Sequence, residues 1–393
     1  MRKLCVTSAL MTGLVLLFSC RKNDSSAPAD DSANTTNCVV QRSAANGRLI
    51  EGQYIVAYRN TPDDVTGISS ARVAAISDGV LRRNNIRQGA VLKTFAGRTS
   101  GFVGRLSRDE VNRLALDSSV SLIEQDRIVA FGACFQVVEP RLITWNIHRV
   151  GYGDGIGKTA WIIDSGIDFT HPDLNADSIR SRSFVSGIAS ARDENGHGTH
   201  VAGIIGAKNN SIGVLGVASG ATLVALKVFD KDGEGTLSSI IQAFAYVNEN
   251  AKAGDVVNLS LGEEKVSAIL DQQVKNTAAR GIYVAIAAGN DGKPAVDFSP
   301  GRVNAPNVYT VSAIDSLDNF ASFSNYGNDV VDFAAPGVRI LSTYKNGRYA
   351  YMSGTSMAAP HVAGLLLLRG SGISSMGVAK NDPDGKPDPI AHK

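Results

Sequence analysis

The run TAWIID (Thr159–Asp164) is the first of five continuous apolar segments that decide the fold of this chain. The other four follow further along: ATLVALKVF, DVVNLSL, GIYVAIAA and NVYTVSAI. None alternates apolar with polar residues, so we expect strands that are covered on both faces. Helical patterns lie between them, for example from Leu237 to Ala251 and from Val266 to Ala279. This alternation predicts an α/β fold, a doubly wound parallel sheet whose site lies at the carboxyl ends of the strands.

Residues 47–131 have a shorter, mixed pattern that predicts a small α+β domain of its own. The strand-like runs QYIVAY, AVLKTF, GFVGRLS and VSLIEQDRIVAF are separated by a helical stretch from Ser69 to Asn84 and by SRDEVNRLALD. Ser107 and Glu110 have the spacing of a capping box at the start of that second helix.

The composition indicates a globular protein and argues against a nucleic-acid partner. The 393 residues are 44% apolar, and 39 Lys and Arg against 37 Asp and Glu leave a formal net charge of +2. No run of basic residues follows a helical stripe or interleaves with aromatic residues, as nucleic-acid-binding surfaces require.

The first residues predict an export signal over residues 1–20, with Arg2 and Lys3 before a short apolar run. A permanent membrane span is the alternative, but the run is short for one. Its end, LFSC, resembles a bacterial lipoprotein signal in which Cys20 becomes the lipid-modified first residue, and residues 21–46 then form a polar linker. We therefore expect an exported protein that is anchored by lipid in a bacterial membrane or at the cell surface, and otherwise secreted.

The four cysteines do not have the spacing of a metal site. Cys5 leaves with the signal, Cys20 is the lipidation site, and Cys38 and Cys134 remain. These two can pair in an oxidising compartment or stay as lone thiols, and both alternatives stay open.

Three polar signatures fall where the predicted strands end: Asp164 closes TAWIID, Asn290 closes IYVAIAAGN, and HGTHVAG opens a helix at His197. A fourth segment, GTSMAAPHVAG, places Ser356 before an apolar helix, where a serine is ordinarily a cap. A serine becomes a nucleophile only with a base and an orienting carboxylate nearby. The histidine census leaves His197 and His200 as base candidates, because the other four histidines are expected to be structural or solvated.

Two alternative readings of these motifs fail. The H-x-x-H pair lacks the glutamate and the i, i+4 spacing of the zinc protease motif. GYGDGIGKT resembles a phosphate loop, but Tyr152 stands where its first glycine belongs, and the segment precedes a strand instead of following one.

The boxes WIIDSGID (Trp161–Asp168), DENGHGTHVAG (Asp193–Gly203) and GTSMAAPHVAG, in that order, resemble the catalytic signatures of the subtilisin family of serine proteases. The similarity runs from about Trp145 to Leu368, a catalytic domain placed at residues 135–370. It implies a serine endopeptidase that acts on polypeptides through an acyl-enzyme. Ser356 is then the nucleophile, His197 the base, Asp164 the orienting carboxylate and Asn290 the oxyanion donor, and His200 belongs to the packed helix face.

By the same resemblance, substrate binds as an extended strand between two backbone edges. These edges and the wall of the first pocket are Gly233, Glu234, Gly235, Ser260, Leu261, Gly262, Ala287, Ala288 and Gly289. Small residues leave room there for a large apolar side chain. Glu263 departs from the family pattern, and both it and Glu234 either favour basic substrate residues or are simply solvated.

The resemblance also implies a structural Ca²⁺ site and an inhibitory propeptide. The calcium ligands are the side chains of Asp173 and Asn210 and the carbonyls of Lys208, Ile212 and Val214, with a tight NNSIG turn as the alternative reading. The small domain at 47–131 resembles the propeptide, which serves as an intramolecular inhibitor and is cut off between about Ala130 and Gln136. We expect a monomer.

After the serine helix, residues 371–393 consist of turn signals and predict an irregular tail. A catalytically silent surface binding module with the same fold is the alternative function. A module of that kind is expected to have lost at least one of the four catalytic groups, and all four are present. An esterase acting on small molecules is a third possibility, which the long strand-binding edges argue against.

Overall fold

The computed structural model describes residues 46–59, 68–130, 136–137, 143–262 and 264–393. The chain divides into two units, Met1–Asn37 and Cys38–Lys393, and all described residues belong to the second. The predicted signal, nearly all of the linker, the four cysteines and Glu263 lie outside the described residues. Within the described ranges, no helix is both long and apolar enough to cross a membrane.

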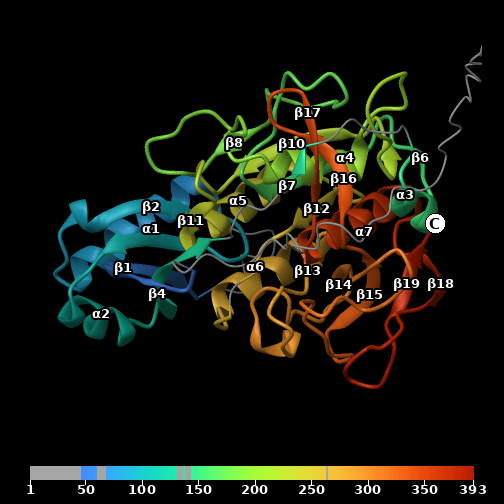
Figure 1. The fold of residues 1–393 in the computed structure, drawn as a ribbon. Helices are drawn as coiled ribbons and strands as arrows, with labels where there is room; N and C mark the ends of the chain where they lie inside the picture. The colour runs from blue at the N-terminus through green and yellow to red at the C-terminus, as the bar shows by residue number, and fades with distance from the viewer. Residues whose placement is uncertain (1–45, 60–67, 131–135, 138–142, 263) are drawn as a thin grey trace, which may run out of the picture. The chain divides into compact units, whose positions relative to one another are not determined.

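A nine-stranded sheet forms the centre of the larger part of the chain (Figure 1). Its strands, in spatial order, are β18 (Ser374–Val378), β19 (Pro389–His392), β15 (Val331–Pro336), β14 (Val308–Ile314), β13 (Tyr283–Ala287), β12 (Val256–Leu259), β7 (Thr159–Asp164), β10 (Thr222–Lys227) and β8 (Arg182–Ser183). All neighbours pair in parallel except β18 with β19. The five predicted strands are β7, β10, β12, β13 and β14, so the doubly wound parallel sheet is confirmed.

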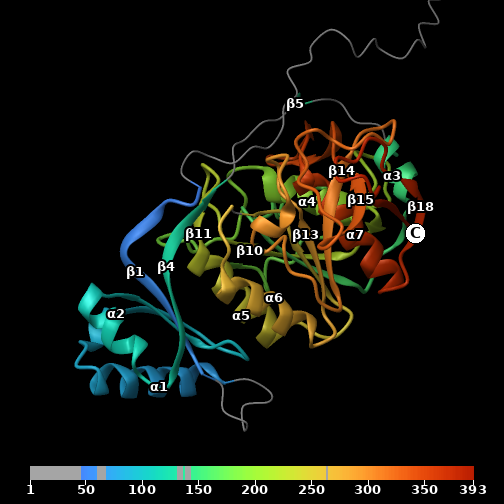
Figure 2. The same ribbon diagram turned by 90° about the horizontal axis from the view of Figure 1, so that it is seen from below.

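Helices cover both faces of this sheet, which is why its strands read as unbroken apolar runs. Helices α4 (His197–Gly206) and α7 (Thr355–Arg369) pack against each other and against the central strands. Helices α5 (Leu237–Asn250) and α6 (Ala268–Ala278) form the second pair, and Figure 2 shows them together on the other side of the sheet. Strands β12 and β7 are fully buried as a result.

The first strand of the sheet, β7, marks its topological switch point. The chain passes from β7 to β10 on one side of β7, and then through α5 to β12 on its other side. Ligand sites of open α/β sheets lie beyond the carboxyl ends of strands at such a point. Asp164 is the last residue of β7 and therefore stands at this position.

The small domain folds as predicted, with two helices on a four-stranded antiparallel sheet. Its elements are β1 (Leu49–Tyr58), α1 (Ser70–Arg83), β2 (Val91–Phe95), β3 (Gly101–Arg105), α2 (Arg108–Ala115) and β4 (Val120–Ala130). The capping box is present, because Ser107 Oγ accepts from Glu110 N–H and the Glu110 carboxylate accepts from Ser107 N–H. A fifth strand, β11 (Glu234–Thr236), joins this sheet beside β4 from the catalytic part of the chain.

Alternation along β1 explains why the small sheet has two apolar faces. Val56 and Tyr58 belong to the core under the helices of the small domain. Ile55 and Ala57 instead belong to the main core of the molecule, together with residues of α5 and α6. With a side-chain period of two, one strand supplies both cores.

The remaining strands are short and lie outside the main sheet. They are β16 (Ile340–Tyr344) and β17 (Arg348–Met352), which form a hairpin beside β5 (Gln136–Val137), and the pair β6 (Gly153–Asp154) and β9 (Ala218–Ser219). Helix α3 (Trp145–Val150) precedes β6.

The prediction of an irregular tail at 371–393 is wrong, and the folded catalytic part extends past residue 370. Strands β18 and β19 continue the main sheet, and Ile390 at 0% exposure packs in a core of its own with Ile314 and Ala334. The sequence did not predict these two strands, because residues 371–393 contain only a few apolar residues among many turn-forming ones. The side chains of the turn-forming residues make hydrogen bonds to the backbone of this segment. For example, Asp382 Oδ2 accepts from Asp388 N–H.

Candidate active site

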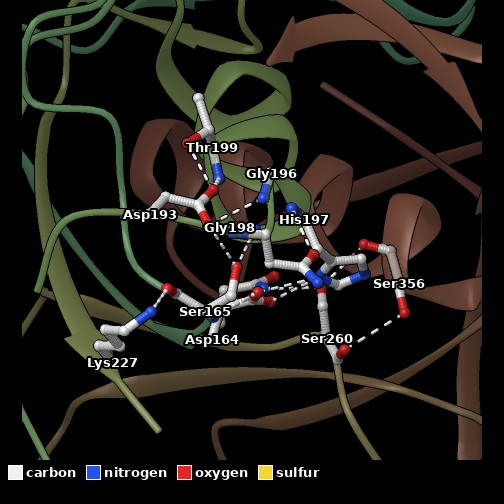
Figure 3. A network of polar contacts seen from close by, with 12 residues as sticks. Asp164, Ser165, Asp193, Gly196, His197, Gly198, Thr199, Lys227, Ser260 and Ser356 are labelled. Atoms are coloured by element: carbon white, nitrogen blue, oxygen red, sulfur yellow. Dashed lines mark hydrogen bonds and ion pairs between the residues drawn. The ribbon is translucent and has the colours of Figure 1, made fainter. Parts of the chain in front are cut away.

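The carboxyl edge of the parallel sheet gathers the residues that were predicted to be catalytic. Asp164 ends β7, and His197 is the first residue of α4. Ser356 is the second residue of α7, and Asn290 follows β13. Figure 3 shows Asp164 and Ser356 on opposite sides of the His197 ring.

The aspartate and the histidine form a buried pair. His197 Nδ1 lies 2.8 Å from Asp164 Oδ1 and 2.9 Å from Oδ2, and both side chains are 0% exposed. A carboxylate in this position favours the tautomer in which Nδ1 carries the hydrogen, which leaves Nε2 as the basic nitrogen. Helix α4 can approach β7 so closely because Gly198 has no side chain, since a Cβ there would lie 2.2 Å from the carbonyl oxygen of Gly166.

The serine stands at the start of α7 without capping it. The N-cap is Gly354, and Ser356 Oγ donates a hydrogen bond to the carbonyl oxygen of Ser260, 3.2 Å away. Ser260 Oγ in turn donates to the carbonyl oxygen of Ser356 at 2.8 Å. These two contacts hold the start of α7 against the end of β12, and the positive end of the α7 dipole lies at this serine.

Asn290 is oriented by the residue before the serine. Its Oδ1 accepts from both the N–H and the Oγ–H of Thr355, at 2.8 Å each, and Gly289 N–H donates to Thr355 Oγ1. Because its oxygen is used in this way, the end of the side chain that can serve a substrate is the amide nitrogen, a donor.

The other histidines near the site are packed and neutral. His200 Nε2 lies 2.9 Å from the carbonyl oxygen of Ala350 and 3.0 Å from that of Ile340, and burial lowers the pKa of His200 to about 3. His361 Nδ1 lies 2.8 Å from the carbonyl oxygen of Met357, and burial lowers the pKa of His361 to about 4. His200 therefore belongs to the core of the helix packing, as expected.

Of the two predicted substrate edges, the first is already paired with a strand of this chain. Glu234, Gly235 and Thr236 of β11 pair antiparallel with Ala130, Val129 and Ile128 of β4. A cavity of about 600 Å³ lies beside them, and Ile128, Val228, Asp230 and Glu234 are among its lining residues. The other predicted substrate residues follow two neighbouring strands of the main sheet. Ser260 to Gly262 come directly after β12, and Ala287 to Gly289 begin at the last residue of β13.

Three of the predicted calcium residues, Lys208, Asn210 and Val214, contact Asp173 through its backbone or its buried carboxylate. Asp173 is 0% exposed, and its oxygens accept from Asn210 Nδ2 at 3.0 Å and from Val214 N–H at 2.9 Å. Burial raises the pKa of Asp173, so a cation beside it would offset the cost of the ionised form. Space is tight, because a Cβ on Gly213 would lie 2.1 Å from Asp173 Oδ2. One carboxylate, one amide and three carbonyls are ligands of the type that Ca²⁺ prefers, but Asn210 Oδ1 here accepts from Ile212 N–H, as in the tight-turn alternative.

Nowhere in the described ranges do three or more His, Cys, Asp or Glu side chains gather as a metal site. The calcium residues contain a single carboxylate and would not make such a group.

Sequence reasoning missed a polar network behind the pair of Asp164 and His197. Asp193 is 4% exposed and accepts hydrogen bonds from Ser165 Oγ, the N–H groups of Asn195, Gly196 and Thr199, and Thr199 Oγ1, at 2.6 to 3.0 Å. Lys227 ends the apolar run of β10 and is 0% exposed. A lysine inside an otherwise apolar strand was a usable signal, because lysine is almost never buried unless it is paired.

A parallel sheet with an aspartate, a histidine and a serine gathered at its carboxyl edge is the arrangement expected of a serine hydrolase. Residues 157–379 match the profile of the Subtilase family. The chain belongs to this family and is a serine protease.

Individual relatives agree with this assignment. The chain is 44% identical over 271 residues to the M-protease of Shouchella clausii (strain KSM-K16), which covers 67% of each chain. It is 34% identical over 377 residues to the alkaline serine exoprotease A of Vibrio alginolyticus, covering 93% of this chain and 69% of that one. Among solved structures, a cold adapted subtilisin-like serine proteinase superimposes with a TM-score of 0.57 at 32% identity, over 64% of this chain and 98% of the other.

Proposed function

We propose that this protein is an endopeptidase in which Ser356 attacks the peptide carbonyl and His197 takes the serine proton. Asp164 holds the imidazole by its Nδ1 side and stabilises the imidazolium that forms. His197 then gives the proton to the leaving amine, and water hydrolyses the acyl-serine by the same route. The observation that supports this proposal is the fully buried contact between Asp164 and His197 beside the first turn of the serine helix.

The tetrahedral intermediate carries its charge on the former carbonyl oxygen. The N–H of Ser356 and the amide of Asn290 are the donors assigned to this oxyanion, and the start of α7 contributes its positive end. Thr355 fixes the Asn290 amide before substrate arrives, so the donor does not have to reorganise during the reaction.

Cleavage of casein and of a small peptide ester tests the proposal. The wild-type mature protein is expected to cleave both, and Ser356→Ala neither. Ester hydrolysis without casein cleavage would favour an esterase acting on small molecules. Failure of the correctly folded wild type to cleave either substrate would favour the silent binding module.

Residues 47–131 are proposed to act as an inhibitory propeptide, which the enzyme removes itself. Three contacts with the catalytic part support this: the pairing of β4 with β11, and two carboxylates at helix starts. Glu124 accepts from Ser267 Oγ and Ile269 N–H at the start of α6, and Asp126 accepts from Ser238 N–H at the start of α5.

Ser356→Ala tests the self-processing. The pure variant is expected to stay uncut between Ala130 and Gln136, whereas the wild type loses this part of the chain, as mass spectrometry detects. A pure Ser356→Ala protein that is still cut there would contradict self-processing.

Asp173, Asn210 and the carbonyls of Lys208, Ile212 and Val214 would hold a structural Ca²⁺. The ion would supply positive charge to the buried Asp173 carboxylate and so stabilise the loop that follows α4. A chelator is expected to lower the melting temperature of the Ser356→Ala protein, and Asp173→Asn to remove that sensitivity. Equal chelator effects in both proteins would contradict this assignment.

Export is proposed from the signal-like residues 1–20 and from the similarity to an exoprotease. Lipid on Cys20 would anchor the protein in a membrane by burial of its acyl chains. In detergent phase partition, wild-type protein made in a bacterium is expected in the detergent phase and Cys20→Ala in the aqueous phase. Wild-type protein in the aqueous phase would contradict lipidation.

A further inference from the structure

Lys227 is a buried charge that the proposed mechanism does not use. It ends β10, where it pairs in register with Asp164 of the neighbouring strand β7. The side chain is 0% exposed, and Nζ donates a 2.7 Å hydrogen bond to the carbonyl oxygen of Ser165. A longer ion pair of 4.0 Å joins Nζ to Glu194, whose side chain is 52% exposed. Burial of an ammonium costs free energy, so its position requires compensation by neighbouring groups.

Ser165 connects this ammonium to both sides of the catalytic pair (Figure 3). Its N–H donates to Asp164 Oδ1 at 2.7 Å, and its Oγ donates to Asp193 Oδ1 at 2.9 Å. Its Oγ also accepts from Gly198 N–H, in the first turn of the helix that carries His197. A single residue therefore touches Lys227, the carboxylate that holds His197, and the carboxylate that binds the start of α4.

The charges around Lys227 come from four carboxylates. They are Asp164 on β7, Asp193 and Glu194 before α4, and Asp230 after β10. Burial lowers the pKa of Lys227, and these four carboxylates oppose that shift. The lysine thus lies beside two buried carboxylates, Asp164 and Asp193, which would otherwise repel each other, and beside two that are more exposed.

Several other titratable groups around α4 are uncharged at neutral pH. Burial lowers the pKa of His200 on α4 to about 3 and that of His361 on α7 to about 4. Burial raises the pKa of Tyr344 on β16 to about 12. Asp164, which contacts the His197 ring, and Asp193, which binds the start of α4, are the carboxylates closest to this helix start.

We propose that Lys227 is a positioning residue that acts through Ser165 and Asp164 and sets the pH range in which His197 works as a base. The proposal rests on the catalytic triad proposed above. A buried cation beside the Asp164 carboxylate opposes the attraction of that carboxylate for a protonated imidazole. Removal of the cation makes His197 hold its proton to higher pH. Because the site is buried, salt does not screen this effect as it screens a surface charge.

The test compares the pH dependence of kcat/KM for Lys227→Met and Lys231→Met on one peptide substrate. Met removes the charge and keeps the length of the side chain, and Lys231 is the matched control because its side chain is 69% exposed. For Lys227→Met, we expect the midpoint of the acidic limb to rise by roughly half a unit to one unit and to stay raised in 1 M salt. For Lys231→Met, we expect no shift in 1 M salt.

Lys227→Arg keeps the positive charge and is the second variant of the test. If Lys227→Met does not fold, Lys227→Arg alone tests the proposal. It is expected to leave the midpoint within about 0.2 units of the wild type, whatever it does to stability. An unshifted midpoint in folded Lys227→Met, or a shift in Lys227→Arg as large as the one predicted for Met, would overturn the proposal. A wild type without peptidase activity, or a Ser356→Ala protein as active as the wild type, would instead overturn the proposed function.

Discussion

Replacement of Asp193 by asparagine is the strongest stability test of the network behind the triad. Asp193 Oδ1 accepts from Ser165 Oγ and the N–H groups of Asn195 and Gly196, and Oδ2 accepts from Thr199 N–H and Oγ1. An amide offers one oxygen and one NH₂ group, so either orientation turns donors toward at least one backbone N–H. The network cannot remain satisfied after this change.

The magnitude follows from the number and type of these hydrogen bonds. Loss of a charge-assisted bond that leaves a buried donor unpaired costs about 1.5–3 kcal/mol, and the remaining bonds weaken when the acceptor becomes neutral. We expect Asp193→Asn to lower the free energy of unfolding by about 3–5 kcal/mol. For a chain of this size, this corresponds to a fall of roughly 4–6 °C in melting temperature.

The assay is thermal unfolding in the Ser356→Ala background, which prevents self-digestion, at one scan rate for all variants. Asp232→Asn is the control, because the same chemical change is made at a side chain that is 64% exposed, and its cost is expected to stay below about 0.5 kcal/mol. A fall for Asp193→Asn of under about 1 kcal/mol, or one equal to that of the control, would refute the reasoning from hydrogen bonds.

Two further predictions concern catalysis and pH. Asn290→Leu is expected to lower kcat by about 100- to 1000-fold with little change in KM, the range known for such a donor in a subtilisin, and steady-state kinetics showing a loss under about 10-fold would contradict its role. Asp388 is 1% exposed, and burial raises its pKa to about 7, so the native state keeps a proton that the unfolded chain releases near pH 4. The contribution of Asp388 to stability is therefore expected to fall as pH rises from about 4 to 7, and Asp388→Asn to remove about 1–2 kcal/mol of pH dependence over that range. Melting temperatures measured across that range with the same slope in both proteins would contradict it.

The sequence predicted the centre of the fold because burial on both faces gives parallel strands an unmistakable pattern. β7, β10, β12, β13 and β14 are long enough for an apolar run to stand out. β15 has the sequence VDFAAP, with an aspartate near its start and a proline at its end. These residues interrupt the apolar run, so the sequence did not predict this strand. β18 is exposed throughout, so it has no apolar face that a pattern could reveal.

The site could be predicted only as far as local motifs reach. Asp164, His197, Asn290 and Ser356 each stand in a recognisable segment, and the structure gathers these segments at one edge of the sheet. The network of Ser165, Asp193 and Lys227 depends on the register between β7 and β10, which sequence spacing does not reveal. The pairing of β4 with β11 likewise joins residues that are about a hundred positions apart, so geometry was needed to find it.

The central claim is that Ser356 is an activated nucleophile, and reaction with a fluorophosphonate tests it most directly. Mass spectrometry of peptides from the labelled mature protein is expected to find one phosphonyl group, on Ser356. Ser356→Ala is expected to remain unlabelled under the same conditions. A folded mature protein that takes up no label, or takes it up on another serine, would contradict the account.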